Sequence, residues 1–307
     1  MNTLLDIVFV ILNYNVFDVT VNCVESIKKN IDTNQYHIII VDNASPNHAG
    51  EKLHKLFEED RYVSYVYSTS NVGFARGNNL GIDFAREHYP SKFVCCLNND
   101  TLLKQKNFFS VLNRKYEEGK PAMIGPKIHL LNDKVQPIMP KLASVDVYVR
   151  IRNKLMHENT YWAVVREYLL SHPLIEWLNN LRHQIKGDYP SDYNNSTKSY
   201  NEEQKNVVLQ GCCLIFTPVF FTKLKGFNPK TFMYVEENIL FVSIRKAGMH
   251  TLYCPKLNII HLESLSTTSV KKNSIKRRKF LCENEIRSLE VLIDEMRFSD
   301  TKQNVSV

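Results

Sequence analysis

Three short apolar runs in the first hundred residues constrain the fold more than any other feature of the chain. They span residues 7–12, 37–41 and 93–97, and each is nearly uninterrupted rather than alternating with polar residues. Strands that are buried on both faces carry this pattern, and such strands form the centre of a mainly parallel sheet covered by helices. The sequence therefore predicts an α/β fold.

Amphipathic segments with helical periodicity lie between these runs, at residues 18–29, 48–58 and 74–88. We expect Asp18 to cap the first helix and Pro90 to close the third. The resulting β-α-β-α-β order joins parallel strands through right-handed crossovers. Ligands of such sheets bind beyond the carboxyl ends of the strands, so that edge is where a site is expected.

The second half of the chain is less regular. Residues 141–205 carry both tryptophans but no strong strand signal, and we expect a helical insertion there, divided by Pro173. Simple packing on the core is the commoner role for amphipathic helices, and a lid or acceptor platform is the alternative. Further elements are expected in five segments: helices at 105–118, 235–247 and 276–296, and strands at 122–128 and 207–216.

Length and charge limit the protein class. The 307 residues are 44% hydrophobic, enough for one large domain, which we place at residues 1–270 with a basic C-terminal helix and tail at 271–307. Apolar runs shorter than about 18 residues and the lack of a leader pattern predict a cytoplasmic protein. Seven cysteines without a CxxC spacing predict buried thiols. The net charge of +7 suits an anionic partner without choosing among nucleotide, nucleic acid and lipid.

Polar residues follow the strands at four places, and all four should meet at one edge of the sheet. They are Asn13–Asn15, Asp42–Ser45, Asn71–Asn79 and Asn98–Asp100. These segments offer side-chain acceptors for a base and ribose, glycines for close backbone approach, and Asp100 for a divalent metal ion. Helix amides and Arg76 would receive phosphate groups. The combination predicts a site for a nucleotide diphosphate.

These motifs resemble those of the family 2 glycosyltransferases, specifically the bacterial rhamnosyltransferase-like group that builds surface polysaccharides. The resemblance runs from Ile7 to about Ser264, apart from the insertion. It implies a GT-A fold, a UDP- or dTDP-sugar donor, and base contact by Asp42. It also places Asn98–Asp100 where the family has its metal-binding motif, for Mn²⁺ or Mg²⁺. The implied nucleotide-binding residues are Asn13, Asn15, Asp42, Asn71, Gly73, Arg76, Asn78, Asn98 and Asn99.

The resemblance continues downstream. Residues 210–215 look like the strand on the acceptor side, and residues 232–237 like the segment that ends in the catalytic acidic pair. We therefore expect Glu237 to be the general base, with Glu236 beside it, and His261 to assist Asp100 with the metal. A base of this kind implies a single displacement that inverts the anomeric carbon.

Other interpretations of these residues stay open. Asp42 could be only a cap, Glu236 and Glu237 could be solvated carboxylates at a helix start, and His261 could be a core histidine. The metal motif has one carboxylate where two are usual, which motivates a catalytically silent nucleotide-sugar binder as a rival. A sugar-phosphate nucleotidyltransferase is the other rival, although Asn13–Asn15 stands where its Gly-rich loop is expected.

The densest basic run lies at residues 271–279. A solvated helix face is the default interpretation. Because the family's acceptors are commonly lipid-linked glycans, contact with an anionic membrane at its inner face is the second. Nucleic acid is not expected as a partner, since the run lacks interleaved aromatic residues. The sequence leaves the oligomeric state open.

Overall fold

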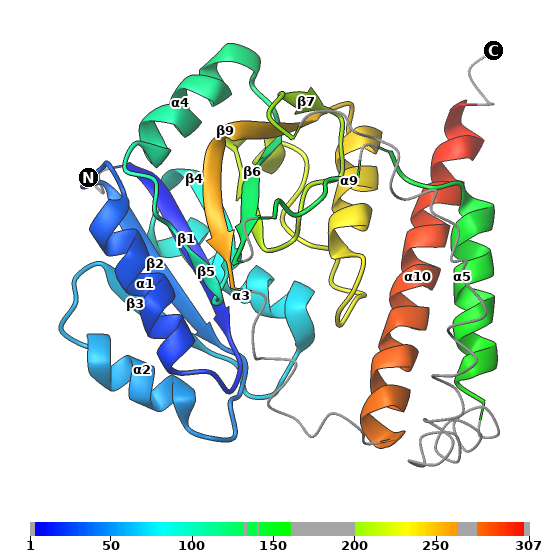
Figure 1. The fold of residues 1–307 in the computed structure, drawn as a ribbon, viewed down its shortest axis with the longest axis horizontal. Helices are drawn as coiled ribbons and strands as arrows, with labels where there is room; N and C mark the ends of the chain where they lie inside the picture. The colour runs from blue at the N-terminus through cyan, green and yellow to red at the C-terminus, as the bar shows by residue number, and fades with distance from the viewer. Residues whose placement is uncertain (1–3, 132–133, 140, 161–199, 263–274, 304–307) are drawn as a thin grey trace.

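The structure, a computed structural model, describes residues 4–131, 134–139, 141–160, 200–262 and 275–303. Within them the strands form one nine-stranded sheet in the order β3-β2-β1-β4-β8-β6-β9-β5, with β7 paired to β9. Helices cover both faces of this sheet (Figure 1). The predicted α/β class is confirmed.

The first four strands are parallel and carry the predicted site segments at their ends. They are β1 (Leu5–Asn13), β2 (Tyr36–Asp42), β3 (Val63–Tyr67) and β4 (Ser91–Asn98). Because β1 lies between β2 and β4, Asn13 is level with Asp42 and Leu12 is level with Asn98. The register alone thus brings three of the four polar segments to one edge.

The helices between these strands match the predicted ranges closely. They are α1 (Asp18–Asn30), α2 (Ala49–Phe57) and α3 (Gly73–His88). The prediction that Asp18 caps α1 is wrong, because Phe17 occupies the cap position and no side chain bonds there. Asp18 lies in the first turn instead, where its charge still favours the positive pole of the helix.

The second half adds antiparallel pairs to the sheet. Its elements are β5 (Thr101–Leu102), α4 (Phe108–Gly119), β6 (Met123–Leu130), α5 (Val145–Glu158), β7 (Gln204–Lys205), β8 (Cys213–Phe216), α8 (Pro218–Phe221), α9 (Glu236–Lys246) and β9 (Thr251–His261). The predicted strand at 207–216 is shorter than expected. A turn in which the amide of Cys213 donates to the carbonyl of Gln210 interrupts it, and Val207 bonds to the Thr251 side chain instead.

The core is divided between the two faces of the sheet. On one face, Ile38 and Ile40 of β2 pack with apolar residues of α1, α2 and α4. On the other, Ile39 and Val41 pack with residues of α3, α8 and α9. This alternation along β2 is the two-sided burial that its apolar run predicts.

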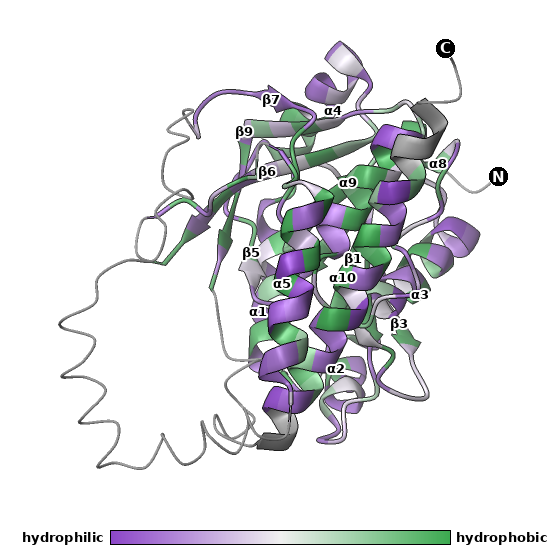
Figure 2. Cartoon of the chain, turned by 90° about the vertical axis from the view of Figure 1, so that its right-hand side faces the viewer, coloured by the Kyte–Doolittle hydropathy of each residue, from purple (hydrophilic) through white to green (hydrophobic). Residues whose placement is uncertain are grey.

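A third apolar cluster joins α5, α9 and the long C-terminal helix α10 (Ile275–Gln303). The last helix was expected at 276–296 and extends further. Figures 1 and 2 show α5 and α10 side by side, with hydrophobic and hydrophilic residues interleaved along both. Of the predicted insertion at 141–205, residues 141–160 and 200–205 are described, and they contain α5 and the short strand β7. The segment around Pro173 lies outside the described residues, and so does the start of the basic run at 271–279. No helix in the described ranges is long and apolar enough to cross a membrane.

Candidate functional site

The ends of β1 and β2 are held together by the carboxylate of Asp42. Its Oδ1 accepts hydrogen bonds from Asn13 Nδ2 at 2.9 Å and from Ser45 Oγ at 2.6 Å, and its Oδ2 accepts one from the Ser45 amide at 3.0 Å. Ser45 Oγ also accepts a bond from the amide of Asn15. Asp42 is therefore more than a cap, because it organises both loops that are expected to meet the base and ribose.

The same network reaches the end of β4. The side-chain oxygen of Asn13 accepts a bond from the Thr20 hydroxyl at 3.0 Å, and Asn99 Nδ2 donates to Thr20 Oγ1 at 2.9 Å. Asn99 directly precedes Asp100 in the chain. One hydrogen-bond network thus joins Asp42, Asn13 and Asn99. These residues lie at the strand ends that the sequence places at one edge of the sheet.

The start of α3 is held by contacts within the protein. The amides of Val72 and Gly73 donate to the side-chain oxygens of Asn43 and Asn71, and the amide of Phe74 donates to the carbonyl of Phe232 at 2.6 Å. The segment before Glu236 therefore lies against the helix start. Binding of phosphate by the helix amides stays a prediction.

The other α3 residues have structural contacts. Gly73 adopts a φ of +85°, and a Cβ there would lie 2.3 Å from the carbonyl oxygen of Phe232, so the close approach requires glycine. Asn78 bonds back to the carbonyl of Phe74. Arg76 donates from Nε to the carbonyl of Pro229 at 2.9 Å. The guanidinium has further N–H donors, so a phosphate role for Arg76 stays a prediction.

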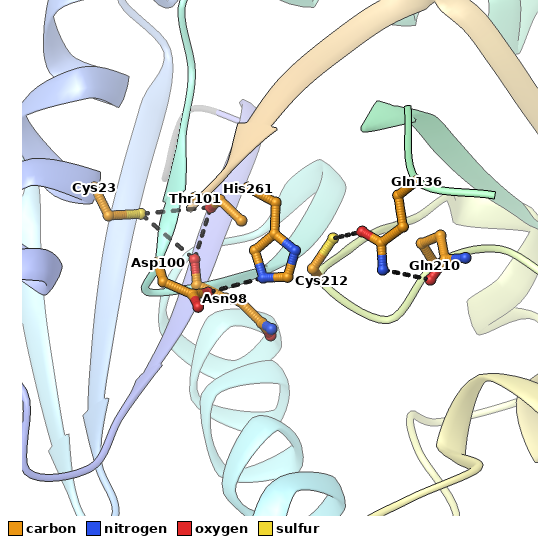
Figure 3. A network of polar contacts seen from close by, with 8 residues as sticks. All are labelled: Cys23, Asn98, Asp100, Thr101, Gln136, Gln210, Cys212 and His261. Atoms are coloured by element: carbon orange, nitrogen blue, oxygen red, sulfur yellow. Dashed lines mark hydrogen bonds and ion pairs between the residues drawn. The ribbon is translucent and has the colours of Figure 1, made fainter. Parts of the chain in front are cut away.

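Asp100 and His261 meet at the metal-side segment. His261 Nε2 lies 3.2 Å from Asp100 Oδ1, and the amide that follows His261 donates to the carbonyl of Asp100. Figure 3 shows the two side chains pointing toward each other, with Cys212 beside them. The Asn98 carbonyl holds the turn that carries Asp100. It accepts hydrogen bonds from Thr101 Oγ1 at 2.7 Å and from the Cys23 thiol at 3.7 Å.

These residues fit a divalent cation in part. Asp100 supplies a hard carboxylate oxygen, which suits Mn²⁺ or Mg²⁺, and His261 supplies an imidazole, which suits transition-metal ions better than Mg²⁺. In the described ranges no group of three or more His, Cys, Asp or Glu side chains gathers as a metal site. His261 Nδ1 is buried without a hydrogen-bond partner among the described residues. Asp100 and His261 therefore supply two possible ligands to a cation.

Glu236 and Glu237 begin α9 directly after two strained residues. Tyr234 and Val235 have φ values of +78° and +54°, a region that β-branched side chains rarely adopt. Burial raises the pKa of Glu237. Burial, and then the charge of Glu237, raises the pKa of Glu236 to about 7. A carboxylate whose pKa approaches neutrality is suited to general-base chemistry.

Cys212 connects the glutamates with the metal-side pair. The amide of Asn98 donates to the Cys212 carbonyl, and a Cβ on Gly211 would lie 3.5 Å from Glu237 Oε2. The pKa of Cys212 is raised well above its usual value, first by burial and then by neighbours that include Asp100 and Glu237. The charges of both carboxylates therefore contribute to the raised pKa of this thiol.

Unsatisfied buried polar atoms concentrate among the predicted site residues. Of five such atoms found in the described part of the chain, three are Asn15 Oδ1, Glu236 Oε1 and His261 Nδ1. Native proteins leave few buried polar atoms without a partner, and those that remain call for a functional explanation. The three lie in the segments that the sequence predicts for nucleotide binding, catalysis and metal binding, and a bound ligand would supply partners for them.

Sequence reasoning missed several residues that complete the site. Thr20 of α1 makes hydrogen bonds to both Asn13 and Asn99. Gln136 accepts a hydrogen bond from the Cys212 thiol and donates one to Gln210 (Figure 3). Thr20 lies one turn into a helix that starts at the site edge, which is a usable signal. Gln136 lies outside any helix or strand, and no local pattern points to it.

The packing of α2 over Asp42 gives a first prediction. A Cβ on Gly50 would lie 2.3 Å from Asp42 Cγ, so Gly50→Ala should displace the carboxylate and lower the free energy of unfolding by about 1–3 kcal/mol. Urea denaturation measures the change. Gly119→Ala is the matched control, because the nearest atom to its new Cβ is 4.0 Å away. Equal stability of both variants would show that Asp42 is not packed in this way.

The burial of Glu236 predicts a pH-dependent stability. Its pKa rises from 4.5 to about 7 on folding, so between these values the folded protein holds a proton that the unfolded chain releases. The contribution of Glu236 to stability is then fully present below pH 4.5 and is lost as pH rises through 7, by on the order of 3 kcal/mol in total. Glu236→Gln should remove this dependence. Urea denaturation of both proteins at about pH 5 and about pH 8 checks it; parallel pH profiles would contradict it.

The fold defines the class of open α/β proteins whose ligands bind at the carboxyl ends of the strands. A sequence model described as "Glycosyl transferase family 2" matches residues 8–169, more than half of the chain. The chain belongs to this family. A relative named Glycosyltransferase GlyG, from Streptococcus pneumoniae serotype 4, is 27% identical over 112 residues. That alignment covers 36% of this chain and 36% of the relative, so the chain matches little more than a third of that protein's length.

Solved structures share the fold. The crystal structure of S. aureus TarS residues 1–349 has a TM-score of 0.51 at 9% identity, covering 84% of this chain and 60% of that one. The crystal structure of GalNAc-T7 with UDP, GalNAc and Mn²⁺ has a TM-score of 0.57 at 13% identity, covering 92% of this chain and 48% of that one. At such identities the likeness concerns the fold alone, and it confirms the predicted GT-A fold.

Proposed function

We propose that this protein transfers a sugar from a UDP- or dTDP-sugar to a growing surface polysaccharide, of O-antigen or capsule type, with inversion at the anomeric carbon. The observation that carries the proposal is the set of three buried, unpartnered polar atoms at Asn15, Glu236 and His261, one in each predicted subsite. Membership in glycosyl transferase family 2 supports it.

Each part of the site has a role in the proposed transfer. The loops organised by Asp42 bind the nucleoside, with Asn13 and Asn15 as polar contacts. Asp100 and His261 lie on the diphosphate side. Glu237 accepts the proton of the attacking acceptor hydroxyl, because burial keeps its pKa raised and its partly buried carboxylate lies beside Gly211 of the acceptor-side segment. Glu236 adjoins Glu237, and the charge of Glu237 contributes to the raised pKa of Glu236.

A divalent cation held by Asp100 and His261 would neutralise the charge of the leaving diphosphate as a Lewis acid. The fold relative GalNAc-T7 was crystallised with Mn²⁺ and UDP, which supports Mn²⁺ as the first ion to test. With only two protein donors, we expect weak metal binding without the nucleotide and tighter binding with it.

A donor-hydrolysis assay tests this function. Purified protein is incubated with a panel of UDP- and dTDP-sugars and Mn²⁺ or Mg²⁺, and released nucleotide is measured. We expect slow release from one donor, dependent on the metal. Binding of a donor without any release, with or without glycan acceptors, would instead favour a catalytically silent partner subunit.

We also propose a lipid-linked glycan as acceptor and a peripheral contact with the inner face of the cell membrane. Arg278 and Lys279 are exposed at the start of α10, next to the exposed ring of Phe280. Cations beside an apolar side chain suit an anionic bilayer surface. Sedimentation with vesicles that contain phosphatidylglycerol tests this contact, and we expect binding that weakens as salt is raised.

A further inference from the structure

The loop of residues 227–235, which delivers the two glutamates, is anchored on one side by α3. Asn79 donates to the carbonyl of Phe227 at 2.9 Å and accepts from its amide at 2.8 Å. The amide of Phe74 donates to the carbonyl of Phe232 at 2.6 Å. These bonds hold the first six residues of the loop, and its last three carry the strained backbone.

The other anchor is α10. Ser288 is fully buried, and its hydroxyl donates to the carbonyl of Met233 at 2.7 Å. Nearby, the ring of Phe280 meets the ring of Phe232 edge-on, with centroids 5.5 Å apart. The helix that lies furthest along the chain therefore contacts the loop immediately before its strained turn.

The position of this hydrogen bond is significant. The Met233 carbonyl belongs to the peptide that precedes Tyr234, the first of the two residues with positive φ. Holding that carbonyl restrains the peptide plane from which the φ of Tyr234 is measured. Non-glycine residues persist in such conformations only where the surroundings hold them, and these outliers gather at functional sites. Glu237 lies three residues beyond.

Docking of α9 on α10 does not depend on this bond. Ile239 and Val242 of α9 pack with Leu289 and Leu292 of α10, and Lys246 pairs with Glu295 at 2.7 Å. Removing the Ser288 hydroxyl should therefore leave the two helices packed while freeing the Met233 peptide.

We propose that Ser288 is a positioning residue, which sets the place of the Glu237 carboxylate by holding the strained turn before α9. The proposal rests on the proposed function for its catalytic consequence. It assigns to α10, which lies outside the family match at 8–169, a part in forming the site.

The experiment compares three variants of the full chain. Ser288→Ala removes the hydroxyl, and Ser288→Thr keeps it. Ser243→Ala removes a hydroxyl whose hydrogen bond among the described residues stays within α9, to the carbonyl of Ile239. Hydrogen–deuterium exchange is measured at amides 233–238, together with kcat and KM for donor hydrolysis. We expect Ser288→Ala to exchange faster at these amides and to lose at least about tenfold in kcat with an unchanged donor KM. The other two variants should resemble the wild type.

Several outcomes would overturn the proposal. One is a rate of hydrogen–deuterium exchange at amides 233–238 that is the same in Ser288→Ala as in the wild type. Another is an equal loss of kcat in Ser288→Ala and Ser288→Thr, because the hydroxyl would then not matter. Exchange that increases throughout α9 and α10 would show a merely structural role. If the wild type hydrolyses no donor, the function proposed above fails, and exchange at 233–238 still decides whether Ser288 holds the turn.

Discussion

Glu237→Gln is expected to abolish sugar transfer while leaving donor binding intact. An amide of the same shape cannot accept the proton of the acceptor hydroxyl, and general-base catalysis typically contributes 10²–10⁴-fold in rate. We therefore expect kcat to fall by about 10²–10⁴-fold, with the Kd for UDP unchanged within about twofold. Released nucleotide reports the first quantity and isothermal titration calorimetry the second.

Glu285→Gln is the matched control for this variant. Glu285 is a partly buried carboxylate on α10 whose pKa is also raised by burial, and it lies outside the proposed site. Its replacement should leave kcat unchanged. Full activity of Glu237→Gln would show that another residue is the general base. Glu236→Gln would then be tested next.

Asp100→Asn should remove the dependence of nucleotide binding on metal. The amide preserves the size of the side chain and can still bond to His261, so the fold is expected to remain. It contributes no negative charge to the cation. Even residues that only support metal ligands change metal affinity by 10–100-fold, so we expect UDP affinity in the presence of Mn²⁺ to fall by at least about 100-fold.

Calorimetric titration with UDP, with and without Mn²⁺, measures this effect. The control is Asp83→Asn, which neutralises an exposed carboxylate on α3 away from the strand ends. The expected pattern is a Kd for Asp100→Asn that no longer responds to Mn²⁺, against a strong response in the control. A preserved response would show that the cation binds elsewhere.

Much of the first half of the fold follows from local sequence. The runs at 7–12, 37–41 and 93–97 became β1, β2 and β4 within two residues at each end, because strands buried on both faces have few alternatives. The edge strand β3 is half exposed and reads Val-Ser-Tyr-Val-Tyr, so it lacks that signal. The strand predicted at 207–216 is shorter in the structure, because a turn at Gly211 breaks the apolar run.

The candidate site was predictable where it consists of loops after strands. Asn13, Asp42 and Asn99 share one hydrogen-bond network because parallel register brings their strand ends level. The contact at the start of α3 could not be anticipated, since the amide of Phe74 bonds to the carbonyl of Phe232, more than 150 residues away in sequence. The same applies to Ser288, whose role depends on how α10 packs against α9. Contacts between segments so distant leave no local pattern.

The proposed function requires that the folded protein bind a nucleotide-sugar with the help of a divalent cation. A thermal-shift screen of UDP- and dTDP-sugars, with and without Mn²⁺, measures this, because a ligand that binds the folded state raises the unfolding midpoint. We predict an upward shift with at least one donor, larger when Mn²⁺ is present. A midpoint unmoved by every nucleotide-sugar, or raised only by nucleic acid, would contradict the account.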